Sequence, residues 1–158
     1  MSTSEAASKQ VLLQPFYMLA AALIGLGDTL YLSYYHWLGI TPTCAIGGCE
    51  IVLQSKYSMI GGTLGIPFAY IGLFFYIYFI ALAVLLAIDP YSKGLRFGLV
   101  VYATIGLLSS IGFEVFQILV IHAICMYCAL SAAVTLVLFC LALWHWRATK
   151  ESSASTVV

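Results

Sequence analysis

Cysteines are the residues of this chain best suited to chemistry, and four of the five fall into two closely spaced pairs. Cys44 and Cys49 form a C-x4-C pair, and Cys125 and Cys128 form a C-x2-C pair. Such thiols can close as disulfides, exchange a disulfide with another dithiol, or bind a metal ion as thiolates. The two pairs are therefore the first candidates for a functional site.

Three interpretations of the pairs compete. They are two structural disulfides that pin a loop to a helix, a zinc site built from four thiolates, or a relay that passes electrons between two dithiols. A C-x2-C pair in the first turn of a helix favours the relay, because the helix dipole and the free N–H groups stabilise a thiolate there. Closed zinc sites mostly belong to small soluble modules, so we expect no metal here.

The composition is that of a membrane protein. Apolar residues make up 63% of the 158 positions and charged residues only 8%, whereas soluble domains carry about 25% charged residues. Each crossing of a ~30 Å hydrocarbon core takes ~20 residues, which leaves room for about four helical spans. Six basic residues balance six acidic ones, so the charge gives no sign of nucleic-acid binding.

One membrane domain over residues 15–146 is predicted, with exposed tails over 1–14 and 147–158. Asp89 and Pro90 open a turn that ends the second span. The apolar stretch after it is ~75 Å long as a helix, so it must fold back, and its midpoint lies at His122. The predicted spans are residues 15–38, 66–88, 97–121 and 124–146.

Basic residues predict the orientation. One side holds both termini and the loop over 89–96, with five basic residues, whereas the other side holds only Lys56. The five are Lys9, Lys93, Arg96, Arg147 and Lys150. Both termini should be cytoplasmic, with the 39–65 loop and the 122–124 turn facing outward. That face is oxidising at a bacterial plasma membrane or in an ER lumen, which suits disulfide chemistry. Cys140 lies ~22 Å deeper than Cys125 along a helix and cannot meet the pairs.

Four features follow one another along the chain. They are the C-x4-C pair, the segment CEIVLQSKYS that starts at Cys49, the segment Leu64-Gly65-Ile66-Pro67, and Cys125-Met126-Tyr127-Cys128 at the start of the fourth span. In this order they resemble the bacterial branch of the vitamin K epoxide reductase family. The resemblance covers about residues 15–146. The unrelated bacterial membrane oxidase of disulfide-forming proteins carries its two pairs in the opposite order, so it does not fit.

The resemblance implies an all-α membrane protein, a four-transmembrane-helix bundle with a redox loop and a short surface helix near residues 50–60. It implies a quinone-linked disulfide oxidoreductase that uses ubiquinone or menaquinone. Many bacterial members carry a fused thioredoxin-like domain, whereas here we expect a stand-alone membrane domain. The donor should then be a separate thioredoxin-fold protein outside the plasma (inner) membrane of a prokaryote.

Residue roles follow from the same resemblance. Cys44 matches the cysteine that exchanges with the partner, and Cys49 the one that passes electrons on by attacking Cys125. Cys128 then faces the quinone. Ser55 matches a serine beside the active cysteines, where it would hydrogen-bond a thiolate; as an alternative it caps the following helical segment. The animal branch has Thr-Tyr-Ala just after its C-x2-C, where this chain has residues 130–133 as Leu-Ser-Ala-Ala, which argues against vitamin K epoxide as a substrate.

Polar residues inside the spans are candidates as well, because a buried carboxylate is costly in a membrane. Glu114 lies ~12 Å below the outer surface and is a candidate to hydrogen-bond or protonate a quinone oxygen, the alternative being a structural hydrogen bond. Asp28 is predicted to be an interhelical partner, and the aromatic stripe over 68–79 to serve helix packing. The competing function is a non-enzymatic scaffold with two structural disulfides, or a four-cysteine metal site.

Overall fold

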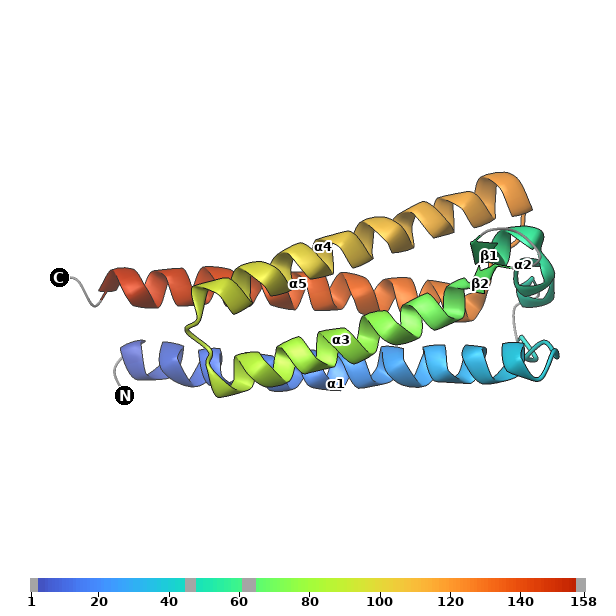
Figure 1. The fold of residues 1–158 in the computed structure, drawn as a ribbon. Coiled ribbons are helices and arrows are strands. Elements are labelled where there is room, and N and C mark those ends of the chain that lie inside the picture. The colour runs from blue at the N-terminus through green and yellow to red at the C-terminus, as the bar shows by residue number, and fades with distance from the viewer. Residues whose placement is uncertain (1–2, 45–47, 61–64, 156–158) are drawn as a thin grey trace.

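Four long helices lying side by side make up most of the molecule (Figure 1). The computed structural model describes residues 3–44, 48–60 and 65–155. The long helices are α1 (Thr3–Trp37), α3 (Phe68–Ile88), α4 (Lys93–Phe116) and α5 (Met126–Ser155). The short elements are α2 (Cys49–Gln54), the 3-10 helix η1 (Lys56–Ser58), the paired strands β1 (Met59–Ile60) and β2 (Ile66–Pro67), and the π-helix η3 (Gln117–Ile121).

In the described part of the chain, four helical segments are long and apolar enough to cross a membrane. They are Lys9–Trp37, Phe68–Ile88, Lys93–Ile121 and Met126–Lys150. The protein is thus an integral membrane protein, and the predicted all-α four-span bundle is confirmed. The expected short surface helix corresponds to α2 and η1, which follow the first cysteine pair.

The first helix begins earlier than the sequence pattern predicts. An exposed tail is expected over residues 1–14, yet α1 starts at Thr3, and both Val11 and Gln14 are buried. The reason is packing against α5, where His145 Nδ1 lies 2.7 Å from Gln14 Oε1. The last helix likewise continues to Ser155, past the predicted boundary at residue 146.

The core of the bundle lies along the helix axes. α1 packs against α3 and α5, and α5 packs against α4 as well. Glycines permit the closest approaches, as is usual between membrane helices: a Cβ at Gly25 would collide with the Tyr76 ring, and one at Gly106 with the Phe75 ring. The buried core residues of the four helices include Met18, Ala22, Tyr76, Phe79, Leu86, Leu99, Ala103 and Leu138.

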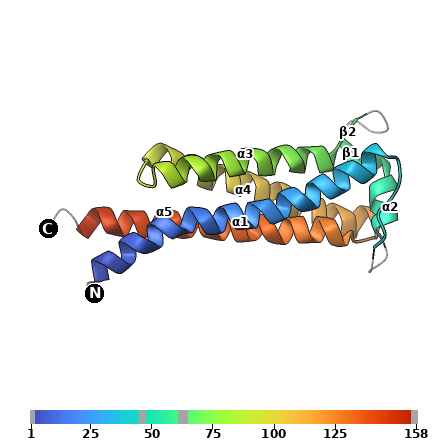
Figure 2. The same cartoon turned by 90° about the horizontal axis from the view of Figure 1, so that it is seen from below.

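The two ends of the bundle differ. Both termini and the turn between α3 and α4 lie at one end, whereas α2, β1, β2 and the turn between α4 and α5 lie at the other (Figures 1 and 2). This arrangement agrees with the prediction that both termini share one side with the 89–96 loop, and that the 39–65 loop shares the other side with the 122–124 turn. Which end faces the cytoplasm stays a prediction from the basic residues.

Candidate functional site

The first cysteine pair is closed as a disulfide. Cys44 and Cys49 are bonded, with Cα atoms 6.1 Å apart. Cys49 is the first residue of α2 and has no exposed surface, whereas Cys44 is only partly buried. The loop pair therefore presents one sulfur toward its surroundings and the other toward the interior of the protein.

The second pair is open. Cys125 directly precedes α5 and Cys128 lies in its first turn, and both are free thiols. Cys49 and Cys125 lie in one buried cluster with Val52, and the partly buried Cys44 and Cys128 pack against it. The structure thus brings together the four cysteines that the sequence singled out. Cys140 is a free thiol exposed on the outside of α5 and has no place in this cluster.

Contacts between the loop that carries the disulfide and the turn between α4 and α5 hold α2 in position. Gly48, just before Cys49, has φ +124°, and a Cβ there would lie 2.8 Å from the carbonyl oxygen of Ile124. On the other side of the disulfide, the Tyr127 hydroxyl donates a hydrogen bond of 3.3 Å to the carbonyl of Thr43. The close approach of the Gly48 backbone to the backbone of Ile124 therefore requires glycine at position 48. This contact places Cys49 next to the turn that carries Cys125.

Hydrogen bonds tune the Cys125 thiol, which lies just outside the span of α5. The Cys128 thiol donates a hydrogen bond to Cys125, and the backbone N–H groups of Cys128 and Tyr127 add two more. Together they outweigh burial, which acts the other way, and lower the pKa of Cys125. A thiol with a lowered pKa is a better leaving group in disulfide exchange.

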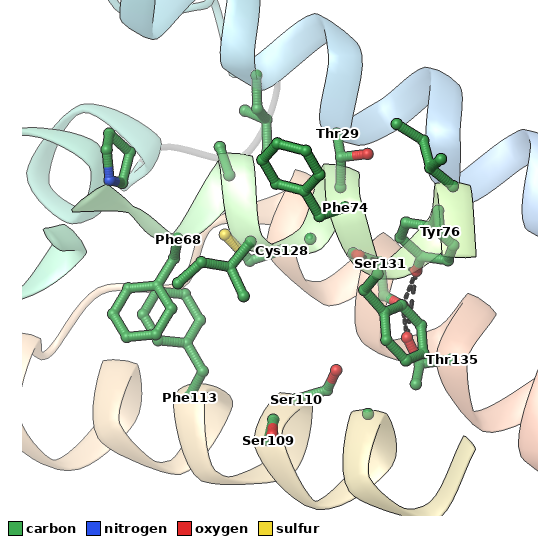
Figure 3. A pocket seen from close by; sticks show the side chains of 18 of the residues that line it. Thr29, Phe68, Phe74, Tyr76, Ser109, Ser110, Phe113, Cys128, Ser131 and Thr135 are labelled. Atoms are coloured by element: carbon green, nitrogen blue, oxygen red, sulfur yellow. Dashed lines mark hydrogen bonds between the residues drawn. The ribbon is translucent and has the colours of Figure 1, made fainter. Parts of the chain in front are cut away.

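A cavity of about 920 Å³ opens beneath α2, between the long helices. Cys128 lies in its wall, and Glu114 and Phe113 of α4 line it as well. Figure 3 shows the Cys128 side chain among aromatic rings, with Phe68 beside Phe113 at one end of the view; their ring centroids are 4.8 Å apart. Cys125 has no part in this lining, so the two cysteines of the second pair face different surroundings.

Polar groups occupy one wall of the cavity. The Tyr76 hydroxyl donates to the carbonyl of Ser131 at 2.9 Å, and it lies 2.9 Å from Ser131 Oγ and 3.1 Å from Thr135 Oγ1. Ser109 and Ser110 project from α4 on the other side (Figure 3). The cavity thus combines stacking surfaces with hydroxyl groups, an arrangement suited to a flat ring that carries polar oxygens.

A family model matches most of the chain. The model of the vitamin K epoxide reductase family covers residues 16–143. This stretch includes the two cysteine pairs, the whole of the second and third spans, and most of the first and fourth. The chain belongs to the vitamin K epoxide reductase family. No curated protein matches it. Membership makes this protein a membrane thiol-disulfide oxidoreductase, of a family that depends on quinones or vitamin K in general.

Ser55 caps the helical segment that follows it, which was the alternative to a hydrogen bond with a thiolate. Its hydroxyl accepts the backbone N–H of Tyr57 at 3.1 Å and so caps the 3-10 helix η1 of this family member. Among the described residues no hydrogen bond joins Ser55 to a cysteine. A direct catalytic role of Ser55 therefore stays a prediction, whereas its capping role is observed.

The two carboxyl groups inside the spans, those of Glu114 and Asp28, differ in their surroundings and hydrogen bonding. Glu114 lines the cavity and accepts a long hydrogen bond of 3.5 Å from Gln117 Nε2. Asp28 is buried in α1, and neither of its oxygens has a hydrogen-bond partner within the described part of the chain. The prediction that Asp28 pairs with another helix is therefore wrong, because no donor from α3 or α5 reaches its carboxylate.

The aromatic stripe over 68–79 serves helix packing, as predicted, because Tyr76 and Phe79 belong to the core. Part of the same stripe also lines the cavity, through Phe68, Phe74 and Tyr76. The alternative of a four-cysteine zinc site does not fit this state of the cysteines, because the sulfur atoms of Cys44 and Cys49 are bonded to each other. Over residues 3–44, 48–60 and 65–155, no three ligand side chains are arranged to hold a metal ion.

Proposed function

We propose that this protein oxidises the dithiol of a thioredoxin-fold partner and passes the electrons to a membrane quinone. One observation carries the proposal: the second cysteine pair connects two compartments of the site. Cys125 is buried with Cys49 under α2, whereas Cys128 lies in the wall of the cavity. Such a pair can receive electrons on one side and deliver them on the other.

The first exchange takes place at the loop. A thiolate of the partner attacks Cys44, the Cys44–Cys49 bond breaks, and Cys49 leaves as a thiolate. The second partner thiol then attacks the mixed disulfide, which releases oxidised partner and leaves Cys44 and Cys49 reduced. The partial exposure of Cys44 and the burial of Cys49 support this order.

The second exchange moves two electrons inward. Cys49 attacks Cys125 of a Cys125–Cys128 disulfide, and Cys128 leaves as a thiolate that takes up a proton. Cys44 then attacks Cys49, restores the loop disulfide and releases Cys125, whose lowered pKa favours its departure as a thiolate. The structure has the loop pair closed and the helix pair open, which matches the product of this step.

The cavity fits the head group of a quinone. Its volume of about 920 Å³ lies within the roughly 300–1,000 Å³ of ordinary ligand sites. Phe68 and Phe113 would hold a ring, and the hydroxyls around Tyr76 and the Glu114 carboxyl would hold its oxygens. A quinone supplies an acceptor for two electrons and two protons, and ubiquinone and menaquinone both meet this requirement. Cys128 is the thiol positioned to deliver the electrons.

The cysteine end is proposed to face the outer side of a prokaryotic plasma membrane, with both termini cytoplasmic. Five basic residues support this choice because they belong to the opposite end of the bundle: Lys9, Lys93, Arg96, Arg147 and Lys150. The thioredoxin-fold partner would then meet Cys44 in an oxidising compartment.

A scaffold with two structural disulfides is the other candidate. It requires both pairs to be closed, whereas Cys125 and Cys128 are free thiols in a reactive setting. The deciding experiment mixes purified protein in detergent with a reduced thioredoxin-fold donor and a soluble quinone while quinol absorbance is followed. We expect catalytic quinol formation that requires both pairs. An absence of turnover with ubiquinone and menaquinone analogues would remove the enzymatic proposal.

A further inference from the structure

Gln117 is a buried polar residue near the end of the third span that the thiol chemistry above does not use. Its side chain has no exposed surface, although the surrounding sequence is apolar. It is also the first residue of η3, a π-helical segment. Single turns of π-helix occur frequently at functional sites, so the role of this residue needs an explanation.

The side-chain amide of Gln117 is oriented by its two neighbours. The backbone N–H of Cys125 donates to Gln117 Oε1 at 2.9 Å, and Gln117 Nε2 lies 3.5 Å from Glu114 Oε1. A peptide N–H can only donate, so the carbonyl end of the amide must face Cys125 and the NH2 end must face the carboxyl of Glu114. The amide therefore connects the second cysteine pair to the wall of the cavity.

The main chain of Gln117 holds the rest of the same turn. Its carbonyl oxygen accepts the N–H of Ala123 at 3.3 Å and also that of His122. His122 has φ +55°, a left-handed conformation that few residue types adopt. Gln117 thus organises the sharp reversal between α4 and α5, and Ile124 of that reversal is the residue on which Gly48 packs.

We propose that Gln117 is a positioning residue for thiol exchange: it holds the peptide N–H of Cys125, keeps the 122–125 turn against α2, and links that turn to Glu114. This proposal rests on the proposed function, because it takes Cys125 as the cysteine that Cys49 attacks. A displaced turn would move the Cys125 sulfur away from its hydrogen-bond donors in the first turn of α5.

The ionisation of Cys125 reports on this geometry. The titratable groups that act on it are Cys128 on its own side of the turn and Asp28 on α1, while Glu114 on α4 acts on Cys128. α2 contributes Cys49, which is disulfide-bonded and does not titrate, and Glu50, whose side chain is exposed. Hydrogen bonds from Cys128 and Tyr127 lower the pKa of Cys125, so a change in the turn must appear in its titration.

The experiment is a titration of the Cys125 thiolate by its ultraviolet absorbance, with the loop disulfide intact and Cys140 replaced by Ala. Subtracting the same titration of a Cys125→Ser variant removes the signal of the tyrosines. Gln117→Leu removes both ends of the amide, and Gln14→Leu is the matched control, because Gln14 is an equally buried glutamine at the other end of the bundle.

We expect Gln117→Leu to raise the midpoint of the Cys125 titration by about one pH unit, which is about tenfold less thiolate at neutral pH. Gln14→Leu should leave the midpoint of the Cys125 titration unchanged even if it lowers the thermal unfolding temperature.

Gln117→Asn keeps an amide but is one methylene too short to reach Cys125, so it should raise the midpoint of the Cys125 titration as well. It replaces the Leu variant if that variant does not fold. An unmoved midpoint in both Gln117 variants, or an equal shift in Gln14→Leu, overturns the proposal. Since the assay contains neither quinone nor donor, its result is independent of the test of the proposed function.

Discussion

Cys125 and Cys128 lie within one turn of each other, yet they serve different sides of the site. Cys125 is covered by α2 and shares a cluster with Cys49, whereas Cys128 reaches the cavity. Residues three apart on a helix are neighbours, which is why the Cys128 thiol can hydrogen-bond the Cys125 sulfur. A single turn of helix therefore links the exchange reaction to the cavity.

The shuttle role of Cys44 can be tested by removing its partner. In a Cys49→Ala variant, Cys44 is a free thiol. Its thiolate can attack the disulfide of an oxidised donor, one donor cysteine leaves as a thiolate, and no second thiol in the loop can resolve the resulting mixed disulfide. We expect a covalent adduct between this variant and the donor to accumulate in cells, visible on a non-reducing gel. The matched Cys44→Ala variant should give no such adduct. A Cys49→Ala protein that stays free of adducts while Cys44 reacts with an alkylating reagent would contradict the assignment.

The lowered pKa of Cys125 predicts how its ionisation depends on Cys128. The largest cause of the lowering is the hydrogen bond from the Cys128 thiol, so Cys128→Ala should raise the pKa of Cys125. Less thiolate is then present at any pH between the old and the new midpoint. Cys128→Ser keeps a donor at this position and should hold the midpoint closer to its original value. Titration of the thiolate absorbance in both variants makes the comparison, and equal midpoints for Ala and Ser would show that this hydrogen bond does not set the pKa.

At the scale of elements, α2 and the reversal between α4 and α5 form one unit. Gly48 packs its backbone on Ile124, and Gln117 holds the reversal from within. The relative placement of Cys49 and Cys125 therefore depends on backbone contacts rather than on the cysteines themselves.

This dependence predicts the effect of Gly48→Ala. The residue has φ +124°, and its new Cβ would lie 2.8 Å from the Ile124 carbonyl oxygen. Because α2 must then move away from the turn, disulfide exchange between the two cysteine pairs should slow by about tenfold or more. The strained backbone conformation of the new alanine itself costs about 1–3 kcal/mol. Gly39→Ala is the matched control, because Gly39 also has positive φ (+68°), but a Cβ added there would meet no atom within 4 Å among the described residues.

The rate to compare is that of electron transfer from the reduced loop pair to the oxidised Cys125–Cys128 pair, followed by mass shifts after alkylation. We expect Gly39→Ala to exchange at close to the original rate. Equal slowing in the two variants would assign the effect to backbone strain alone and reject the contact with Ile124.

The elements that were predictable are those set by length and hydropathy. An apolar stretch too long for one span had to reverse near His122, and the structure reverses there, with that residue in a left-handed conformation. The early start of α1 was not predictable, because it depends on Gln14 meeting His145 of a distant helix. Gln117 was missed for the same reason: its importance comes from the fold of the reversal, and a lone amide in an apolar stretch gives no signal of its own.

At the scale of the whole molecule, the two ends of the bundle are built differently. The end that holds the termini is closed by polar contacts: His145 contacts Gln14 and Pro90, and Arg96 bonds the carbonyls of Tyr91 and Ser92. The other end holds the disulfide, the free dithiol and the cavity. The order and spacing of the cysteines were enough to predict that the two pairs meet at one end of the bundle, whereas the cavity required the packing of the long helices to be known.

This asymmetry leads to a prediction that compares two cysteines of the same helix. Cys128 lies in the cavity wall, whereas Cys140 is exposed on the outside of α5, and 12 residues of helix separate them by ~18 Å. Thiol exchange needs the sulfur atoms in contact, so Cys140→Ala should retain quinol formation and lose only the small packing contribution of one thiol. Cys128→Ala should remain folded and inserted but form no quinol, while its loop pair still exchanges once with the donor. Quinol production is measured for both variants at matched protein levels. Comparable losses in the two variants, or retained turnover in Cys128→Ala, would mean that electrons leave the protein by a route other than the cavity wall at Cys128.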